Sequence, residues 1–109
     1  MVEHRSVAAR AAGSIPVIHP IMVCFCIKIS GFVQGVFFRY SAKVEAEKLA
    51  LVGYVKNLDD GLVESVVCGK AEKIDEFVKW CHKGPVLAQV EKVEIKEIPF
   101  RKFENFNIV

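Results

Sequence analysis

The order of two apolar patterns constrains the fold of this chain more than any other feature of its sequence. One pattern alternates apolar and polar residues, which is typical of a strand with one buried face. The other repeats apolar residues every three or four positions, which is typical of a helix. The alternating pattern runs from Val23 to Gly31, and the helical pattern runs from Phe38 to Leu49, with Gly53 predicted to stop the helix. The fold is therefore expected to begin with a strand, a loop and a helix.

A predicted hairpin follows the first helix. The segments "YVKNL" and "LVESVVC" are rich in strand-forming residues, and Asp59, Asp60 and Gly61 between them form a turn signal. A turn of this kind between two such segments is typical of a β-hairpin. We therefore expect two neighbouring antiparallel strands, with Asp59 and Asp60 as turn residues.

The rest of the chain predicts a second helix and two more strands. The helix has an apolar stripe with offsets of three and four residues, and Gly84 followed by Pro85 is expected to end it. The stripe consists of Ile74, Phe77, Val78 and Cys81. A long strand is expected from about Leu87 to Ile98, with a β-bulge between Val90 and Val93, where the apolar phase shifts. The ending "FNIV" predicts a short last strand.

These segments together predict an α+β fold. Their order is strand, helix, strand, strand, helix, strand, with a C-terminal edge strand added. Because both helices are amphipathic, we expect them to cover one face of an antiparallel sheet, as in the ferredoxin-like βαββαβ sandwich. That fold hosts many functions, so function must be argued from particular residues.

The charge of the chain argues against several classes of partner. Its 109 residues contain 15 Lys and Arg and 13 Asp and Glu, for a net charge of +2, and the two signs alternate along the charged stretches. No nucleic-acid or membrane partner is therefore expected. RNA-recognition domains share the predicted strand order, but the segment "GLVESVVCG" lacks their stacking aromatic residues. No apolar run approaches the roughly 20 residues that span a bilayer. We predict a cytoplasmic protein, and a monomer by default.

The four cysteines show no metal-binding spacing. Cys24, Cys26, Cys68 and Cys81 form neither a C-x-x-C pair nor a cluster with histidines, so no metal and no other cofactor is predicted. Because their number is even, disulfide bonds between them remain an alternative. However, Cys24 and Cys26 share one strand phase, and all four occupy positions where small buried side chains are expected. This favours reduced thiols in the cytosol.

Residues 1–20 differ in composition from the rest of the chain. They contain Arg5 and Arg10 against the single acid Glu3, several alanines and no strand alternation. They lack the continuous apolar run of a secretory signal, and they are poor in the serines of a transit peptide. We interpret residues 1–20 as a leader or disordered extension, without a predicted role, and residues 21–109 as one domain.

The stretch "GFVQGVFFR", residues 31–39, predicts a site for an anion. Gly31 and Gly35 permit a sharp turn that aims successive N–H groups at one point. Arg39 adds a permanent charge and a forked set of donors at the start of the following helix, where free N–H groups also favour negative charge. The loop lacks the Lys-Ser/Thr ending of a Walker motif, which argues against a nucleotide with Mg²⁺. The predicted ligand is a phosphate group.

A nucleophilic mechanism is not expected. Within the predicted domain, His82 is the single histidine, and it lies on the polar face of the second helix. A Ser-His or Cys-His pair would therefore lack its base.

Two segments resemble the signatures of the acylphosphatase family. "GFVQGVFFR" fits the pattern G-x-V-Q-G-V-x-F-R, and "GYVKNLDDGLVESVVCG" fits a glycine and an aromatic residue followed by N-x-x-x-G-x-V and a later glycine. The resemblance covers Val23 to Val109, including "GPVLAQVEKVEI" and "FENFNIV". It implies an enzyme that hydrolyses carboxyl-phosphate anhydrides such as acetyl phosphate, carbamoyl phosphate and 1,3-bisphosphoglycerate. It also implies that no metal and no covalent intermediate are used.

The resemblance also implies roles for individual residues. Arg39 matches the arginine that binds phosphate, and Asn57 matches the asparagine that orients the attacking water. The phosphate-binding loop would supply the remaining donors from Gln34, Gly35, Val36, Phe37 and Phe38. Inorganic phosphate is then both product and inhibitor. Ala42 departs from the threonine of many animal members, which argues against hydroxyl support of the site.

Several alternatives stay open at this point. An asparagine before a turn commonly serves the turn itself, and Gln34 could orient the loop by hydrogen bonding without touching substrate. The chain could also be a non-catalytic phosphate-binding or interaction module on the same fold. The predicted contacts all address phosphate, so they do not identify the physiological acyl phosphate.

Overall fold

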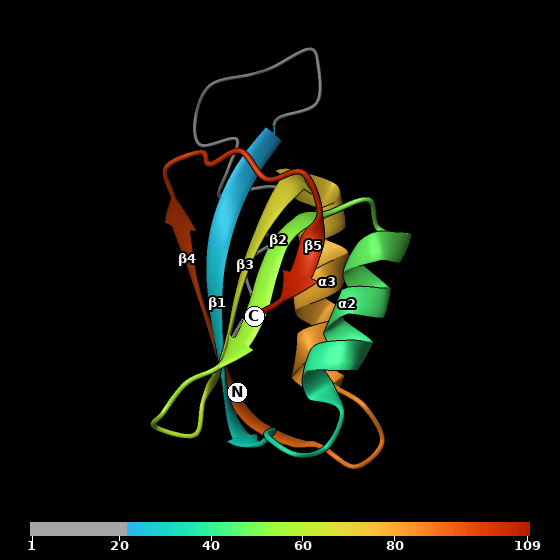
Figure 1. Cartoon of the computed structure of the whole chain (residues 1–109), viewed down its shortest axis with the longest axis vertical. Coiled ribbons are helices and arrows are strands. Elements are labelled where there is room, and N and C mark those ends of the chain that lie inside the picture. The colour runs from blue at the N-terminus through green and yellow to red at the C-terminus, as the bar shows by residue number, and fades with distance from the viewer. Residues whose placement is uncertain (1–21) are drawn as a thin grey trace.

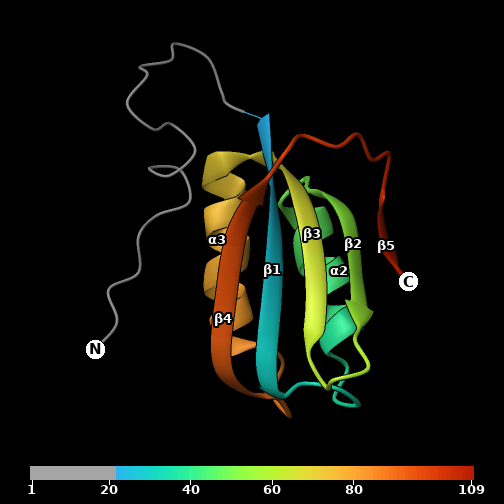
Figure 2. The same cartoon turned by 90° about the vertical axis from the view of Figure 1, so that its left-hand side faces the viewer.

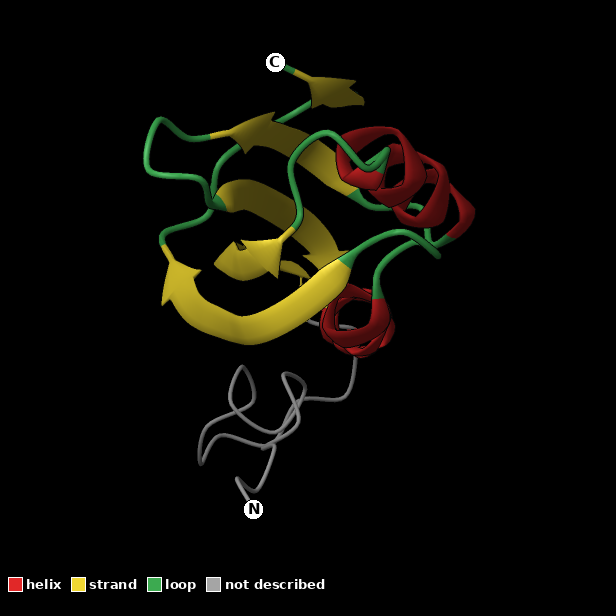
Figure 3. Cartoon of the chain, turned by 90° about the horizontal axis from the view of Figure 1, so that it is seen from below, coloured by secondary structure: helices red, strands yellow, loops and turns green. Residues whose placement is uncertain are grey.

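The computed structural model describes residues 22–109, so the predicted leader, residues 1–20, lies outside the described residues. The described residues form five strands and two helices. In chain order these are β1 (Met22–Phe32), α2 (Phe38–Lys48), β2 (Val52–Asn57), β3 (Val63–Lys70), α3 (Ala71–Lys83), β4 (Gln89–Ile98) and β5 (Phe106–Ile108). Both helices lie on one face of the sheet (Figures 1 and 3). The predicted ferredoxin-like α+β arrangement is confirmed.

The sheet has the strand order β4-β1-β3-β2-β5. β1 pairs antiparallel with β3 and β4, and β2 pairs antiparallel with β3. The predicted C-terminal edge strand, β5, pairs parallel with β2, a direction that the sequence did not indicate. The reason is that β4 ends at the end of the sheet where β2 begins, and the connection 99–105 therefore returns the chain in the direction of β2 (Figure 2).

The predicted bulge in β4 lies beside the end of β1. Ser30 is opposite Lys92 and Gly31 is opposite Val90, so Glu91 is the extra residue. A Cβ atom on Gly31 would lie 2.2 Å from the carbonyl oxygen of Gln89, so this close approach admits only glycine. The bulge therefore shapes the strand end that leads into the loop 33–37.

The predicted helix stop at Gly53 is wrong. The first helix, α2, ends at Lys48, and Ala50 adopts the left-handed backbone after it, with φ of 58°. Gly53 instead lies within β2, where a Cβ atom would sit 1.9 Å from the carbonyl oxygen of Val66 on β3. The glycine is needed for strand contact and not for helix termination.

The main core lies between the sheet and the helices. The alternating face of β1 is buried there, and the predicted stripe of α3 is fully buried, which confirms both patterns. The α3 helix ends at Lys83, with Gly84 as its cap, as predicted. A smaller cluster packs on the other face of the sheet around Cys24, Val66 and Cys68.

The expectation of four reduced thiols is wrong for two of them. Cys24 and Cys68 are direct cross-strand neighbours on β1 and β3, and a disulfide joins them. Cys26 and Cys81 are free. Burial raises the pKa of both free thiols, so both are held in the uncharged form. The pairing depends on strand register, which the spacing of cysteines alone does not determine.

Neither helix of residues 22–109 is long and apolar enough to cross a membrane.

Candidate active site

The loop between β1 and α2 has a backbone suited to binding an anion. Gly35 has φ of 76° and Phe37 has φ of 67°, so left-handed residues flank Val36. Alternation of this kind turns successive N–H groups toward one side and forms an anion-binding concavity. The sequence indicated the role of Gly35. It did not indicate that of Phe37, because a left-handed backbone is uncommon for a bulky residue.

The N-terminus of α2 adds further donors to this loop. The helix begins at Phe38, its cap residue Phe37 makes no side-chain hydrogen bond to it, and its first turn contains no acidic residue. The first N–H groups of a helix have no partner within the helix and attract negative charge. An anion beside the loop 34–39 would therefore meet both sets of N–H groups.

Arg39 lines an open pocket next to this loop. The pocket has a volume of about 310 Å³ and is lined by Gly35, Phe37, Arg39, Tyr40 and Ile108. Three residues predicted from sequence therefore come together at one place. Tyr40 and Ile108 were missed. Tyr40 could have been predicted as a site residue, because it is an aromatic residue directly after Arg39. Ile108 could not, because only the fold brings the C-terminal strand to the pocket.

Val36 and Phe38 contribute to the site from the core. The two residues are 3% and 2% exposed, so their side chains lie in the core and do not face a ligand. The ring of Phe38 packs against Trp80 on α3, with 5.2 Å between ring centroids. The side chains of Val36 and Phe38 thus anchor the loop on the layer of helices.

Gln34 connects the loop to the β2–β3 hairpin. Its Nε2 donates hydrogen bonds to the carbonyl oxygens of Leu58, at 2.8 Å, and Leu62, at 2.9 Å. The two N–H groups of the amide are thereby used, so its side chain positions the loop. The hairpin turn is held in addition by Asp60, whose Oδ1 accepts a hydrogen bond from the N–H of Leu62 at 3.1 Å, as expected of a turn residue.

Asn57 ends β2 beside this turn, opposite Val63 of β3. Its side-chain oxygen Oδ1 is buried and has no hydrogen-bond partner among the described residues. An unsatisfied buried acceptor costs about 1–3 kcal/mol, so its presence calls for an explanation, such as a bound water or a catalytic role. Asn57 does not line the pocket of Arg39, but it directly precedes Leu58, which Gln34 binds. The loop and the hairpin lie at the same end of the sheet (Figures 1 and 2).

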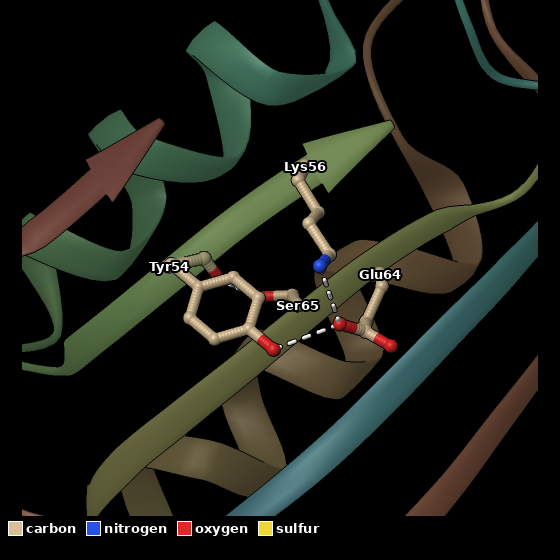
Figure 4. Close-up of polar contacts among 4 residues, drawn as sticks. All are labelled: Tyr54, Lys56, Glu64 and Ser65. Carbon is tan, nitrogen blue, oxygen red and sulfur yellow. Dashed lines mark hydrogen bonds and ion pairs between the residues drawn. The ribbon is translucent and has the colours of Figure 1, made fainter. Parts of the chain in front are cut away.

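A polar cluster holds β2 against β3 on the face away from the helices (Figure 4). The hydroxyl of Tyr54 donates to Oε2 of Glu64 at 2.8 Å, and Nζ of Lys56 lies 3.9 Å from the same oxygen. On the opposite face of the sheet, toward the helices, the buried Ser65 lies beside Val55, and its hydroxyl donates to the Tyr54 carbonyl at 2.9 Å. Burial, together with the hydrogen bond to Glu64, raises the pKa of Tyr54 to about 12. The cluster stabilises the register of the hairpin that carries Asn57.

Comparison with known proteins points to one family. Residues 25–108 match the family model described as acylphosphatase. An acylphosphatase of Rubrobacter xylanophilus is 53% identical over 73 residues, which are 67% of this chain and 66% of the relative. An acylphosphatase of Vibrio vulnificus is 45% identical over 86 residues, which are 79% of this chain and 96% of the relative. The structure of an acylphosphatase from Coxiella burnetii superposes with a TM-score of 0.79 at 41% identity, covering 81% of this chain and 93% of that one.

Proposed function

This chain belongs to the acylphosphatase family of hydrolases, and we propose that it hydrolyses acyl phosphates at the pocket beside Arg39. The observation that carries the proposal is the convergence of Gly35, Phe37 and Arg39 on that pocket. The left-handed loop, the uncapped start of α2 and a guanidinium group there all favour one kind of ligand, a phosphoryl group.

The chemistry of phosphoryl transfer suits this arrangement. In the transition state, charge spreads over the three equatorial oxygens, so catalysis depends on positioning and charge stabilisation. The N–H groups of residues 34–39 supply fixed donors, and the planar fork of Arg39 can hold two oxygens at once. The donors are preorganised, because Val36 and Phe38 are buried in the core and Gln34 is tied to the hairpin.

Asn57 is proposed to hold the attacking water. Its buried, unpartnered Oδ1 can accept a hydrogen bond from water, and a neutral amide does not repel phosphate as a carboxylate would. Attack forms a bond from the water oxygen to phosphorus and breaks the bond from phosphorus to the acyl oxygen. The leaving group is a carboxylate, which needs no strong general acid. The products are a carboxylate and inorganic phosphate, and the product phosphate is expected to inhibit by occupying the same loop.

No metal is assigned to this mechanism. Arg39 and the backbone donors supply the positive charge, and residues 22–109 contain no group of three or more His, Cys, Asp or Glu side chains arranged for a metal ion.

The monomeric state and the cytoplasmic location stay predictions. The disulfide between Cys24 and Cys68 argues against the cytoplasmic location, since stable disulfides are rare in reducing compartments such as the cytosol.

The test is the release of inorganic phosphate from acetyl phosphate by the purified full chain, with and without a chelator. We expect turnover that the chelator leaves unchanged and that inorganic phosphate inhibits competitively. Phosphate binding without turnover would instead identify a non-catalytic phosphate-binding module. Loss of turnover on chelation, with recovery on adding a divalent metal, would contradict the metal-free mechanism.

A further inference from the structure

The pocket beside Arg39 carries more apolar surface than phosphate binding requires. Three of its lining side chains are apolar or aromatic and together form what we call the apolar rim: Phe37, Tyr40 and Ile108. They are 72%, 64% and 40% exposed. Among the described residues that line the pocket, Arg39 carries the charge. Exposed apolar side chains gathered around one cation mark a place where a ligand with both characters binds.

The apolar rim is held in place by the fold. Phe37 and Tyr40 flank Arg39 at the start of α2, so their positions follow from the same helix end. Ile108 reaches the pocket from β5, which is fixed on both sides. Nζ of Lys43 on α2 donates to the carbonyl oxygen of Phe106 at 2.6 Å, and the N–H of Val109 donates to the Val55 carbonyl at 3.0 Å. A ligand would therefore meet preformed apolar surface.

We infer that the apolar rim contacts the acyl group of the substrate and selects acyl phosphates whose acyl group is an uncharged alkyl or aromatic chain. The inference rests on the proposed function, because a phosphoryl group held at Arg39 leaves the acyl group to be placed against the rim. A short acyl group such as acetyl would reach little of this surface. An acyl group with its own phosphate or carboxylate would set a charge against apolar side chains, which costs desolvation without a partner.

The experiment measures binding separately from turnover. Isothermal titration calorimetry of the full chain with methyl-, butyl- and hexylphosphonate reports the contribution of chain length, because the phosphonate group is the same in all three. A fully buried methylene is worth about fourfold in affinity, and the rim is open on one side. We therefore expect about twofold tighter binding per methylene, or about thirtyfold from methyl to hexyl. Hydrolysis of acetyl phosphate and of benzoyl phosphate, whose acyl group is apolar, is measured on the same samples.

Two separate variants test the rim. Tyr40→Ser and Ile108→Ser should each reduce the gain from methyl- to hexylphosphonate by threefold or more. Phe37 is left intact because its backbone belongs to the loop. The control is Phe100→Ser, which removes a 62% exposed ring from the connection between β4 and β5, at the opposite end of the sheet, and should keep the whole gain (Figure 1).

The possible results have distinct meanings. Equal affinity for the three phosphonates in the unaltered protein would overturn the inference. The inference would also be overturned if both rim variants kept the full gain in affinity from methyl- to hexylphosphonate, because the alkyl chain of the ligand would then be bound elsewhere. If the unaltered protein shows the gain in affinity with chain length and both rim variants lose it, the inference is supported. A gain in affinity that persists in a protein that hydrolyses neither acetyl phosphate nor benzoyl phosphate would refute the proposed function while supporting the apolar contact.

Discussion

Gln34 and Leu58 are joined by a hydrogen bond of 2.8 Å from the side-chain amide of the first to the backbone carbonyl of the second. The bond links the loop that precedes Arg39 to the turn that follows Asn57. The same amide also binds the carbonyl of Leu62 at 2.9 Å. The two proposed site residues thus belong to segments held together by one side chain.

Removal of that side chain should disturb both segments. Gln34→Ala removes one hydrogen bond from each of two carbonyl oxygens, which keep their backbone donors, the N–H groups of Gly61 and Leu58. Each lost hydrogen bond is worth about 0.5–1.5 kcal/mol, so we expect the free energy of unfolding to fall by about 1–3 kcal/mol. Phosphate affinity and kcat should fall together, because the loop loses its fixed position. Urea denaturation, phosphate titration and initial rates measure these effects. Unchanged phosphate affinity in a folded Gln34→Ala protein would show that the loop does not depend on the hairpin.

Arg39→Ala should weaken inhibition by phosphate and lower kcat by about 10² to 10³, the range for loss of one preorganised donor to developing charge. Arg39→Lys should recover little, because lysine keeps the charge but loses the planar fork. The measurement is kcat and the phosphate inhibition constant for both variants, with circular dichroism to establish folding. Near-complete rescue by lysine would mean that charge alone matters at this position.

Asn57→Ala should separate chemistry from binding. It removes the proposed partner of the attacking water, so kcat should fall while phosphate still binds with nearly unchanged affinity. It also removes a buried acceptor that has no partner among the described residues, so the free energy of unfolding should stay the same or rise by up to about 1 kcal/mol. The combination of lost turnover and kept stability is the distinguishing result. Retained kcat would make Asn57 a turn residue, and lost phosphate binding would place it in the phosphate site.

The disulfide between Cys24 and Cys68 should stabilise the fold without serving the site. The two residues are separated by 44 positions, and reduction should lower the free energy of unfolding by about 2–4 kcal/mol. A Cys24→Ser, Cys68→Ser double variant should be correspondingly less stable and should not respond to reductant. Thiol labelling of the unfolded, unreduced protein checks the pairing. It should modify Cys26 and Cys81 alone, and labelling of all four cysteines would show that the disulfide is not formed.

Tyr54 should make stability depend on alkaline pH. Its pKa is raised from 10.0 to about 12 by burial and by the hydrogen bond to Glu64. Between these values the folded protein binds the phenolic proton more tightly than the unfolded chain. The stabilisation is therefore complete below about pH 10 and is lost as the pH rises toward 12. Urea denaturation between pH 9 and 12 should show a steeper decline for the unaltered protein than for Tyr54→Phe. Parallel curves would contradict the assignment.

Local patterns determined much of the fold. The alternation from Val23 to Ile29 and the stripe of α3 each follow from neighbours in the chain, and both match buried faces in the structure. The bulge near Val90 could be predicted because an extra residue shifts the phase of the pattern within one strand. The loop at Gly35 and its charged neighbour Arg39 likewise form one continuous segment.

Features that depend on distant segments needed the tertiary structure. Gly53 resembles a helix stop in sequence, but the nearby carbonyl of Val66 on β3 is what requires a glycine there. The partner of Cys24 follows from the register between β1 and β3, and the direction of β5 follows from where β4 ends. Ile108 joins the pocket of Arg39 only because β5 lies beside β2. The chemistry at the loop is thus local to the sequence, whereas the apolar surface beside it is assembled from segments that only folding brings together.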